Sequence, residues 1–284
     1  SMNSNFKYSW EEAVQWLRNQ PEQKELVQYC YYDDPLESAA ERFAQSEEWF
    51  AVTQLLKQKI PGQVLDIGAG RGISSYAFAK AGCSVTSLEP DSSKLVGAGA
   101  ISNLFKNTGL PIQIVQEWGE TLPFANNTFD IVYGRAVLHH AKDLKQLCKE
   151  AARVLKPGGY FIATREHILS RKEDLQNFLD SHPLHHLYGG ENAYLLEEYT
   201  GAIRSSGLQI IRSFNPLESV INYFPMSKSQ YQSQVKNSLA RRFGETLASK
   251  LAMFEQVQSL YSWYMSRKLD TPGRLYSFLA IKPS

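Results

Sequence analysis

Residues 64–72 read Val-Leu-Asp-Ile-Gly-Ala-Gly-Arg-Gly, and this stretch decides the fold. A short, mostly apolar run leads directly into a glycine-rich turn, which is typical of a buried strand that precedes a helix. Glycine permits tight turning and close approach of the backbone to a bound molecule. The first turn of the helix leaves backbone N–H groups free to face that molecule. The stretch therefore predicts a ligand-binding turn at the end of a strand.

The spacing of the glycines narrows the class of ligand. Gly68, Gly70 and Gly72 give GxGxG, whereas the dinucleotide fingerprint GxGxxG needs a glycine at position 73, which is isoleucine here. This difference argues against a dehydrogenase. An acid, Glu89, ends the next expected strand, and a carboxylate there can accept hydrogen bonds from both hydroxyls of a ribose. Since dehydrogenases also place an acid there, Glu89 indicates a nucleoside cofactor without choosing its class.

From residue 62 onward, short β-branched runs alternate with amphipathic stretches. This alternation predicts an α/β fold of Rossmann-like type, with a doubly wound, mostly parallel seven-stranded sheet and helices on both faces. The expected strands are Val64–Ile67, Ser84–Leu88, Ile112–Glu117, Phe129–Tyr133, Tyr160–Thr164, Leu208–Phe214 and Tyr276–Ile281. The run Lys-Pro-Gly-Gly at 156–159 predicts a sharp turn between a helix and the fifth strand.

Three regions are expected along the chain. Residues 1–60 form N-terminal helices, 61–165 form the cofactor-binding core, and 166–284 complete the sheet and carry insertions at 166–193 and 217–270. We expect the N-terminal helices and both insertions to form a helical lid over the carboxyl edge of the sheet, where open α/β sheets bind ligands.

Composition argues against several functional classes. The net charge of the 284 residues is +1, which lacks the basic excess of a nucleic-acid binder, so no nucleic-acid partner is expected. Three separated cysteines form no metal or disulfide pattern and favour a cytoplasmic location. No stretch has the ~20 apolar residues of a membrane span, and the start lacks the apolar run of a signal peptide, so no membrane association is expected. Oligomeric state is left open.

Further runs complete a pattern. Residues 119–124 read Gly-Glu-Thr-Leu-Pro-Phe, Phe-Asp follows at 129–130, and a predicted helix over 144–155 leads into the Lys-Pro-Gly-Gly turn. Together with the glycine turn and Glu89-Pro90, these runs resemble the class I S-adenosylmethionine-dependent methyltransferases, in particular the type 11 group, strongly over residues 62–165. The resemblance implies S-adenosylmethionine as cofactor and S-adenosylhomocysteine as product.

The resemblance also implies positions for the cofactor. Gly68, Ala69 and Gly70 would line its methionine and ribose, Asp66 would face its amino group, Glu89 would hold the ribose and Gly119 would meet the adenine. The family often has an acid for the adenine amino group where this chain has Trp118. Trp118 would therefore stack on adenine, or adenine would be held by backbone, with a core or lid contact as the alternative role of Trp118. Pro90 and Arg135 complete the expected cofactor set.

The implied reaction is in-line attack on the sulfonium methyl, which needs a base only when the acceptor loses a proton. The run Tyr-Gly-Arg-Ala-Val-Leu-His-His at 133–140 lacks the Asn/Asp-Pro-Pro-Tyr run seen in methyltransferases of amide and exocyclic base nitrogens. His139 and His140 are candidate bases, or structural histidines that bond a neighbouring loop. His167, after the fifth strand, is a candidate base oriented by Glu166, or part of a surface turn.

Two further segments are candidates for substrate contacts. Residues 182–192 carry His182, His185, His186, Glu191 and Asn192 around a Gly-Gly pair, and they would wrap a polar acceptor or merely cap helices. Adjacent histidines lack the usual ligand spacing, so no metal is expected.

Tyr31 and Tyr32 would close over the cofactor, or pack against helices while Asp34 caps the next helix. The aromatic stripe of Tyr261, Trp263 and Tyr264 is expected in the core.

The sequence thus predicts an S-adenosylmethionine-dependent methyltransferase of a small hydroxylated molecule, such as a sugar or natural-product intermediate, with O-methylation favoured. Methylation of RNA or protein is one alternative, and binding of the cofactor without catalysis is another.

Overall fold

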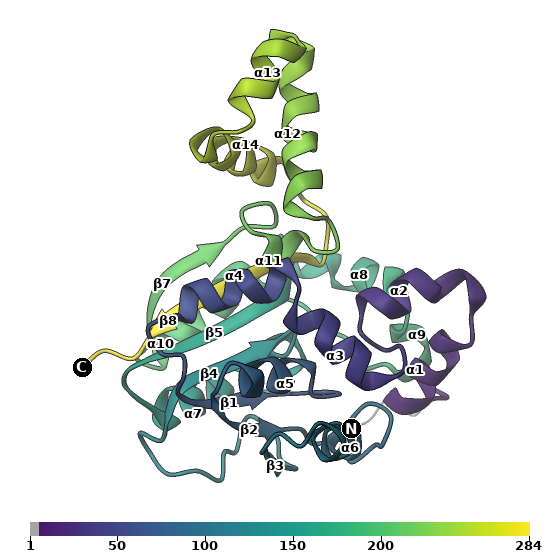
Figure 1. The fold of residues 1–284 in the computed structure, drawn as a ribbon, viewed down its shortest axis with the longest axis vertical. Coiled ribbons are helices and arrows are strands. Elements are labelled where there is room, and N and C mark those ends of the chain that lie inside the picture. The colour runs from purple at the N-terminus through teal and green to yellow at the C-terminus, as the bar shows by residue number, and fades with distance from the viewer. Residues whose placement is uncertain (1–5) are drawn as a thin grey trace.

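The computed structural model describes residues 6–284, which form one central sheet with helices on both faces (Figure 1). The strand order is β3-β2-β1-β4-β5-β8-β7, in which β8 runs antiparallel to both neighbours and the other pairs are parallel. A two-residue strand, β6, pairs with the end of β5. The strands are β1 (Gln63–Ile67), β2 (Ser84–Leu88), β3 (Gln113–Val115), β4 (Phe129–Arg135), β5 (Leu155–Leu169), β6 (Tyr194–Leu195), β7 (Gln209–Phe214) and β8 (Arg274–Ile281). The predicted fold class is confirmed.

The fifth strand is longer than predicted. It includes the Lys-Pro-Gly-Gly run, which was predicted as a turn before the strand. It also includes residues 165–167, which were predicted to follow the strand. Register shifts on both sides explain the difference: β5 bulges against β4 between Phe129 and Ile131, and against β8 between Ala163 and Glu166. A bulge leaves a residue unpaired and re-aims its neighbours. Residues 165–167 therefore lie within the sheet and not on a surface turn.

Helices bury both faces of the sheet, and residues 64–67 of β1 are accordingly buried whichever face they point to. One core cluster joins the sheet to α3, α4, α5 and α6, and a second joins it to α7 and α10. The bounds are α3 (Leu36–Ala44), α4 (Glu47–Leu56), α5 (Ile73–Lys80), α6 (Ala98–Thr108), η2 (Leu138–His140), α7 (Leu144–Val154) and α10 (Leu196–Ser205). No helix within residues 6–284 has both the length and the apolarity to cross a membrane.

The first helices pack against a distant segment of the chain at one end of the sheet (Figure 1). A small core cluster joins Ala13, Leu17 and Val27 to Leu184 and Leu187. The elements are α1 (Trp10–Arg18), η1 (Pro21–Gln23), α2 (Lys24–Tyr29), η3 (Lys172–Asp174), α8 (Leu175–Ser181) and α9 (His185–Tyr188). Two parts of the predicted lid thus contact each other, while residues 1–5 of that region lie outside the described residues.

The second insertion contains an arm that extends away from the sheet (Figure 1). Its helices are α11 (Val220–Tyr223), which stays on the body, and α12 (Lys228–Phe243), α13 (Glu245–Leu251) and α14 (Glu255–Lys268), which form the arm. The predicted core position of the aromatic stripe is wrong for two of its members, since Trp263 and Tyr264 are 53% and 45% exposed. Their helical spacing is typical of a buried face, but of the three only Tyr261 packs against the small apolar cluster of the arm within residues 6–284.

Candidate functional site

The glycine turn joins β1 to α5 and uses backbone conformations that favour glycine. Gly68, Gly70 and Gly72 have φ values of +60°, +56° and +87°. A Cβ atom on Gly68 would lie 2.7 Å from Val137, so this glycine is required for packing against the segment that follows β4. A Cβ atom on Gly70 would meet nothing within 4 Å. The turn therefore packs on one side and leaves open space on the other.

Glu89 follows β2 and supports this turn directly. Its Oε1 accepts a hydrogen bond from the Gly70 N–H at 2.9 Å, and its Oε2 accepts one from Asp91 at 2.8 Å. Burial raises the pKa of Glu89 to about 7, because desolvation disfavours the charged carboxylate. Each carboxylate oxygen retains a lone pair for a further donor. Pro90 follows at a half-buried position.

Asp66 is buried and bonds the start of α5. Its Oδ2 accepts hydrogen bonds from the Ser74 and Ser75 hydroxyls at 2.7 and 2.6 Å. Burial raises its pKa to about 6, and the two serines oppose that shift. This carboxyl group therefore fixes the helix to the strand that carries the glycine turn.

Arg71, within the glycine turn, has a role that the sequence did not reveal. Its buried guanidinium donates to the backbone oxygens of Tyr31, Asp33 and Leu95 at 2.7–3.0 Å, and to Asp34 Oδ1 at 2.7 Å. The predicted N-cap at Asp34 is wrong, because Pro35 precedes α3 and no side chain caps it. Asp34 instead pairs with Arg18 and Arg71. Arg71 thus ties the segment after α2 to the cofactor turn.

Arg135 ends β4 and forms a two-point pair with the fully buried Glu48 of α4, at 2.7 and 3.0 Å. Burial opposes its charge, but Glu48 outweighs burial and raises the pKa of Arg135. The guanidinium also lies over the ring of Tyr31, which is only 2% exposed and packs against Phe43 and Phe224. Tyr31 therefore follows the packing interpretation and not the substrate-contact one, whereas Tyr32 remains half-buried beside Trp10.

Trp118 and Gly119 lie between β3 and β4 and differ sharply in exposure. Trp118 is 62% exposed, which rules out the core contact considered for it. Gly119 is buried, and a Cβ atom there would lie 2.9 Å from Leu147. An aromatic face is thus available to a ligand next to a tightly packed glycine.

Glu166 of β5 and His139 of η2 form a buried pair. The carboxylate accepts backbone hydrogen bonds from Val137, Leu138 and His139, and its Oε2 lies 2.8 Å from His139 Nδ1. Burial disfavours a charged ring, but Glu166 and Glu191 outweigh it and raise the pKa of His139 to about 9. The predicted acid–histidine pair therefore exists, but Glu166 orients His139 and not the adjacent His167.

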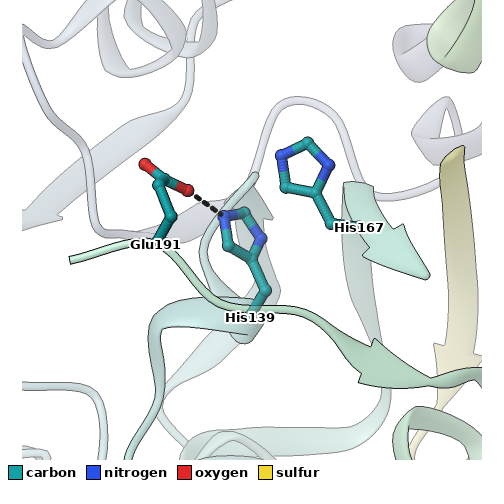
Figure 2. A group of neighbouring side chains, drawn as sticks. All are labelled: His139, His167 and Glu191. Carbon is teal, nitrogen blue, oxygen red and sulfur yellow. Dashed lines mark ion pairs between the residues drawn. The ribbon is translucent and has the colours of Figure 1, made fainter. Parts of the chain in front are cut away.

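His167 and Glu191 complete a cluster with His139, and the three side chains point toward one another (Figure 2). One potential ligand atom from each lies within 4.8 Å of the other two. His139 Nε2 is 3.7 Å from Glu191 Oε2, and His167 Nδ1 is 2.8 Å from the Gly273 carbonyl. Burial and the neighbouring His139 lower the pKa of His167 to about 4. We call His139, His167 and Glu191 the histidine cluster.

The other predicted histidines lie around this cluster. His140 Nδ1 bonds the Gly190 carbonyl at 3.0 Å, as the structural alternative had it. His182 Nε2 lies 3.6 Å from Glu191, and His185 Nδ1 accepts the Glu191 N–H at 3.2 Å. Exposed His186 contacts Trp16 instead, and Asn192 is half-buried beside Glu191. The segment therefore positions Glu191 more than it presents five separate polar groups.

The glycine turn and the histidine cluster adjoin each other. Val137, which packs against Gly68, is two residues from His139, and its N–H donates a hydrogen bond to Glu166.

Comparison with known proteins identifies the family to which this chain belongs. A family described as "Methyltransferase domain" matches residues 65–163. A ubiquinone biosynthesis O-methyltransferase of Rhizobium leguminosarum bv. trifolii is 30% identical over 185 residues, which cover 62% of this chain and 72% of that protein. The chain belongs to the class I S-adenosylmethionine-dependent methyltransferases.

Other similar proteins agree with this assignment. A protein of the same name from Rhizobium etli is 31% identical over 169 residues, or 56% of this methyltransferase and 66% of that protein, just under two thirds of its length. A solved structure of geranyl diphosphate methyltransferase in complex with GPP and sinefungin superposes with a TM-score of 0.60 at 14% identity, covering 96% of this chain and 98% of that chain. That likeness concerns the fold alone.

The cofactor of this methyltransferase family is S-adenosylmethionine, and the residues at the turn fit it. The space in front of Gly70 gives a ligand access to the backbone. The Glu89 carboxylate beside it can accept the two hydroxyls of a ribose. Thus both features that the sequence assigned to the cofactor adjoin each other in the structure.

Proposed function

We propose that this chain transfers a methyl group from S-adenosylmethionine to a hydroxyl oxygen of a small molecule. Two similar proteins carry O-methyltransferase in their names. The observation that carries the proposal is the histidine cluster beside the glycine turn. A hydroxyl acceptor must lose its proton during methyl transfer, and imidazole and carboxylate groups suit that task. Nitrogen acceptors such as amines need no such cluster once they are neutral.

The cofactor contacts are part of the same proposal. Glu89 holds the ribose, the turn at 68–70 lines the methionine portion, and Asp66 keeps this turn fixed through α5. Gly119 meets the adenine by its backbone, and the exposed Trp118 stacks on it. Pro90 and Arg135 shape the walls, Arg135 through its pair with Glu48.

The bound cofactor supplies an electrophilic methyl group on a positively charged sulfur. A bond forms between the acceptor oxygen and the methyl carbon, the carbon–sulfur bond breaks with its electron pair on sulfur, and the hydroxyl proton departs. His140 or His167, whose pKa burial lowers so that the ring is neutral, accepts that proton and releases it to solvent, and Glu166 positions the neighbouring His139.

The acceptor lies between the cluster and the segments packed around it. We propose that α1, α2 and residues 182–192 cover it, since they share one apolar cluster. Tyr32, His182, His185 and Asn192 then line the acceptor side. With three unpaired cysteines, Cys30, Cys83 and Cys148, the chain suits a reducing cytoplasm.

The test is methyl transfer from labelled S-adenosylmethionine to matched panels of phenols, sugars, amines, transfer RNA and denatured protein, with mass spectrometry to locate the methyl group. We expect O-methyl products from one of the first two panels and none from the others. Binding of S-adenosylhomocysteine without transfer to any panel would instead favour a cofactor-binding protein. Label confined to RNA or protein would contradict the proposal outright.

A further inference from the structure

The histidine cluster has the form of a metal site. Its residues come from three separate elements: His139 from η2, His167 from β5 and Glu191 from the loop after α9 (Figure 2). They are held together by the fold, because His139 is 1% exposed and the Glu191 side chain is 6% exposed. Two imidazoles and one carboxylate on one centre are a recurrent ligand set for divalent transition metals.

The outer hydrogen bonds of the cluster are those of metal-ligating histidines. Such histidines almost always direct one ring nitrogen to a carboxylate or backbone carbonyl, which turns the other nitrogen toward the ion. His139 Nδ1 contacts the Glu166 carboxylate at 2.8 Å, and His167 Nδ1 contacts the Gly273 carbonyl at 2.8 Å. Among residues 6–284, no hydrogen-bond partner is found for His167 Nε2. Both Nε2 atoms are therefore the candidate ligands.

The geometry and charge of the cluster suit a small dication. Ligands of a tetrahedral zinc lie roughly 3.3 Å apart when each is about 2.0 Å from the ion. His139 Nε2 and Glu191 Oε2 are already 3.7 Å apart, and one ligand atom from each of the three residues lies within 4.8 Å of the other two. A protonated His139 balances only one of the two carboxylates, Glu166 and Glu191, whereas a divalent ion bound to the neutral ring would balance both.

We propose that His139 Nε2, His167 Nε2 and Glu191 bind a divalent transition-metal ion of the zinc class. His182 is not a ligand in this assignment, because its Nδ1 accepts the Leu184 N–H at 3.1 Å and its Nε2 donates toward Glu191. Imidazole ligands select such ions over magnesium, which prefers oxygen. Glu166 holds His139 from outside the ligand set.

Three protein ligands leave one position for an oxygen ligand, as in catalytic zinc sites. This part rests on the proposed function: the open position takes the acceptor hydroxyl, whose O–H ionises more readily on a cation, and the proton passes to solvent. The ion itself is neither oxidised nor reduced. Metal binding can be measured without any acceptor, so the two proposals fail separately.

The experiment measures metal in tag-free protein after dialysis against a chelator. Zn²⁺ is titrated calorimetrically, Co²⁺ is followed by its visible absorption, and Mg²⁺ serves as the competing ion. We expect one Zn²⁺ or Co²⁺ per chain, with the strong absorption bands of low coordination number, and no displacement by Mg²⁺. Glu191→Gln and His167→Gln should each weaken binding by more than roughly tenfold, and Glu166→Gln by roughly 10- to 100-fold.

His186→Gln is the matched control, since this histidine lies in the same segment but contacts Trp16. It should keep wild-type metal affinity. Retained binding of S-adenosylhomocysteine shows that each variant is folded. Equal metal affinity in Glu191→Gln and His186→Gln, or the lack of a stoichiometric site in folded wild-type protein, overturns the metal site. If O-methyl transfer still occurs in such metal-free protein, the proposed function stands alone.

Discussion

The Nη1 atom of Arg71 lies 2.7 Å from the backbone oxygen of Tyr31, a contact that joins the glycine turn to the segment after α2. The same guanidinium serves two other carbonyls and one carboxylate. Its loss leaves several of these acceptors unsatisfied in the interior. Arg71 therefore links the cofactor turn directly to residues 31–34.

Arg71→Ala is expected to lower the free energy of unfolding by about 2–4 kcal/mol and to weaken binding of S-adenosylhomocysteine. Urea denaturation and calorimetry measure the two effects. Arg18→Ala is the matched control, because Arg18 also pairs with Asp34 but has no bond to the turn. Equal loss of cofactor affinity in both variants would show that the Asp34 pair, and not the turn contact, is responsible.

Cofactor affinity is expected to rise with pH through the pKa of Glu89. Burial raises that pKa to about 7, so the carboxylate that accepts ribose hydroxyls is the minor form at pH 6 and the major form at pH 8. The dissociation constant of S-adenosylhomocysteine should fall by roughly tenfold over this range. Glu89→Gln should bind weakly with a flat profile. A sloping profile in Glu89→Gln would assign the effect to another group.

The raised pKa of Glu89 also has a consequence for stability. A carboxyl whose pKa is higher in the folded state favours folding in its protonated form, so its contribution is greatest at low pH. That contribution declines as the pH rises from about 4.5 to about 7. Between those values, Glu89→Gln should become steadily more stable relative to wild type, as measured by urea denaturation. No change in this difference with pH would contradict the assignment.

Trp118→Ala is expected to weaken S-adenosylhomocysteine binding by roughly fivefold or more, because stacking of a base on an aromatic ring contributes about 1–3 kcal/mol. Trp118→Phe should retain most of the affinity. Trp263→Phe, which removes an exposed tryptophan of the arm, is the control. Quenching of tryptophan fluorescence by the ligand should disappear in Trp118→Phe and persist in Trp263→Phe.

Glu48→Gln is expected to destabilise the fold by about 3 kcal/mol, because it leaves the Arg135 charge without its partner. Glu47→Gln, on the exposed neighbour in α4, should change the free energy of unfolding by less than about 1 kcal/mol. Urea denaturation compares the two. A small effect of Glu48→Gln would mean that water or another group takes over the charge of Arg135.

Local patterns predicted the sheet well. Strands such as β1 and β2 are short runs rich in apolar and β-branched residues with turns at both ends, so their positions follow from neighbouring residues. The extension of β5 was not predictable, because it depends on a bulge opposite β8, more than 100 residues away. Likewise, the exposure of Trp263 depends on where the arm extends and not on helical spacing.

The sequence predicted many of the individual residues of the site, but not which of them contact one another. Glycine spacing and the position of Glu89 are local and indicated the cofactor. The pairing of Glu166 with His139, and the placement of Glu191 near His139, join residues 27 or more positions apart. The role of Arg71 could not be predicted, because its hydrogen-bond partners Tyr31 and Asp34 lie about 40 positions away in the sequence. The signal in the sequence was a long charged side chain at position 71, directly between two glycines of the turn.

The apolar cluster that joins α1 and α2 to Leu184 and Leu187 packs two stretches of chain together that are far apart in the sequence. Glu191 comes three residues after the end of α9, while His139 and His167 stay with the sheet. Swinging the first helices outward would therefore drag the carboxylate off the two imidazoles. Opening the cover over the proposed acceptor site would thus also loosen the proposed metal site.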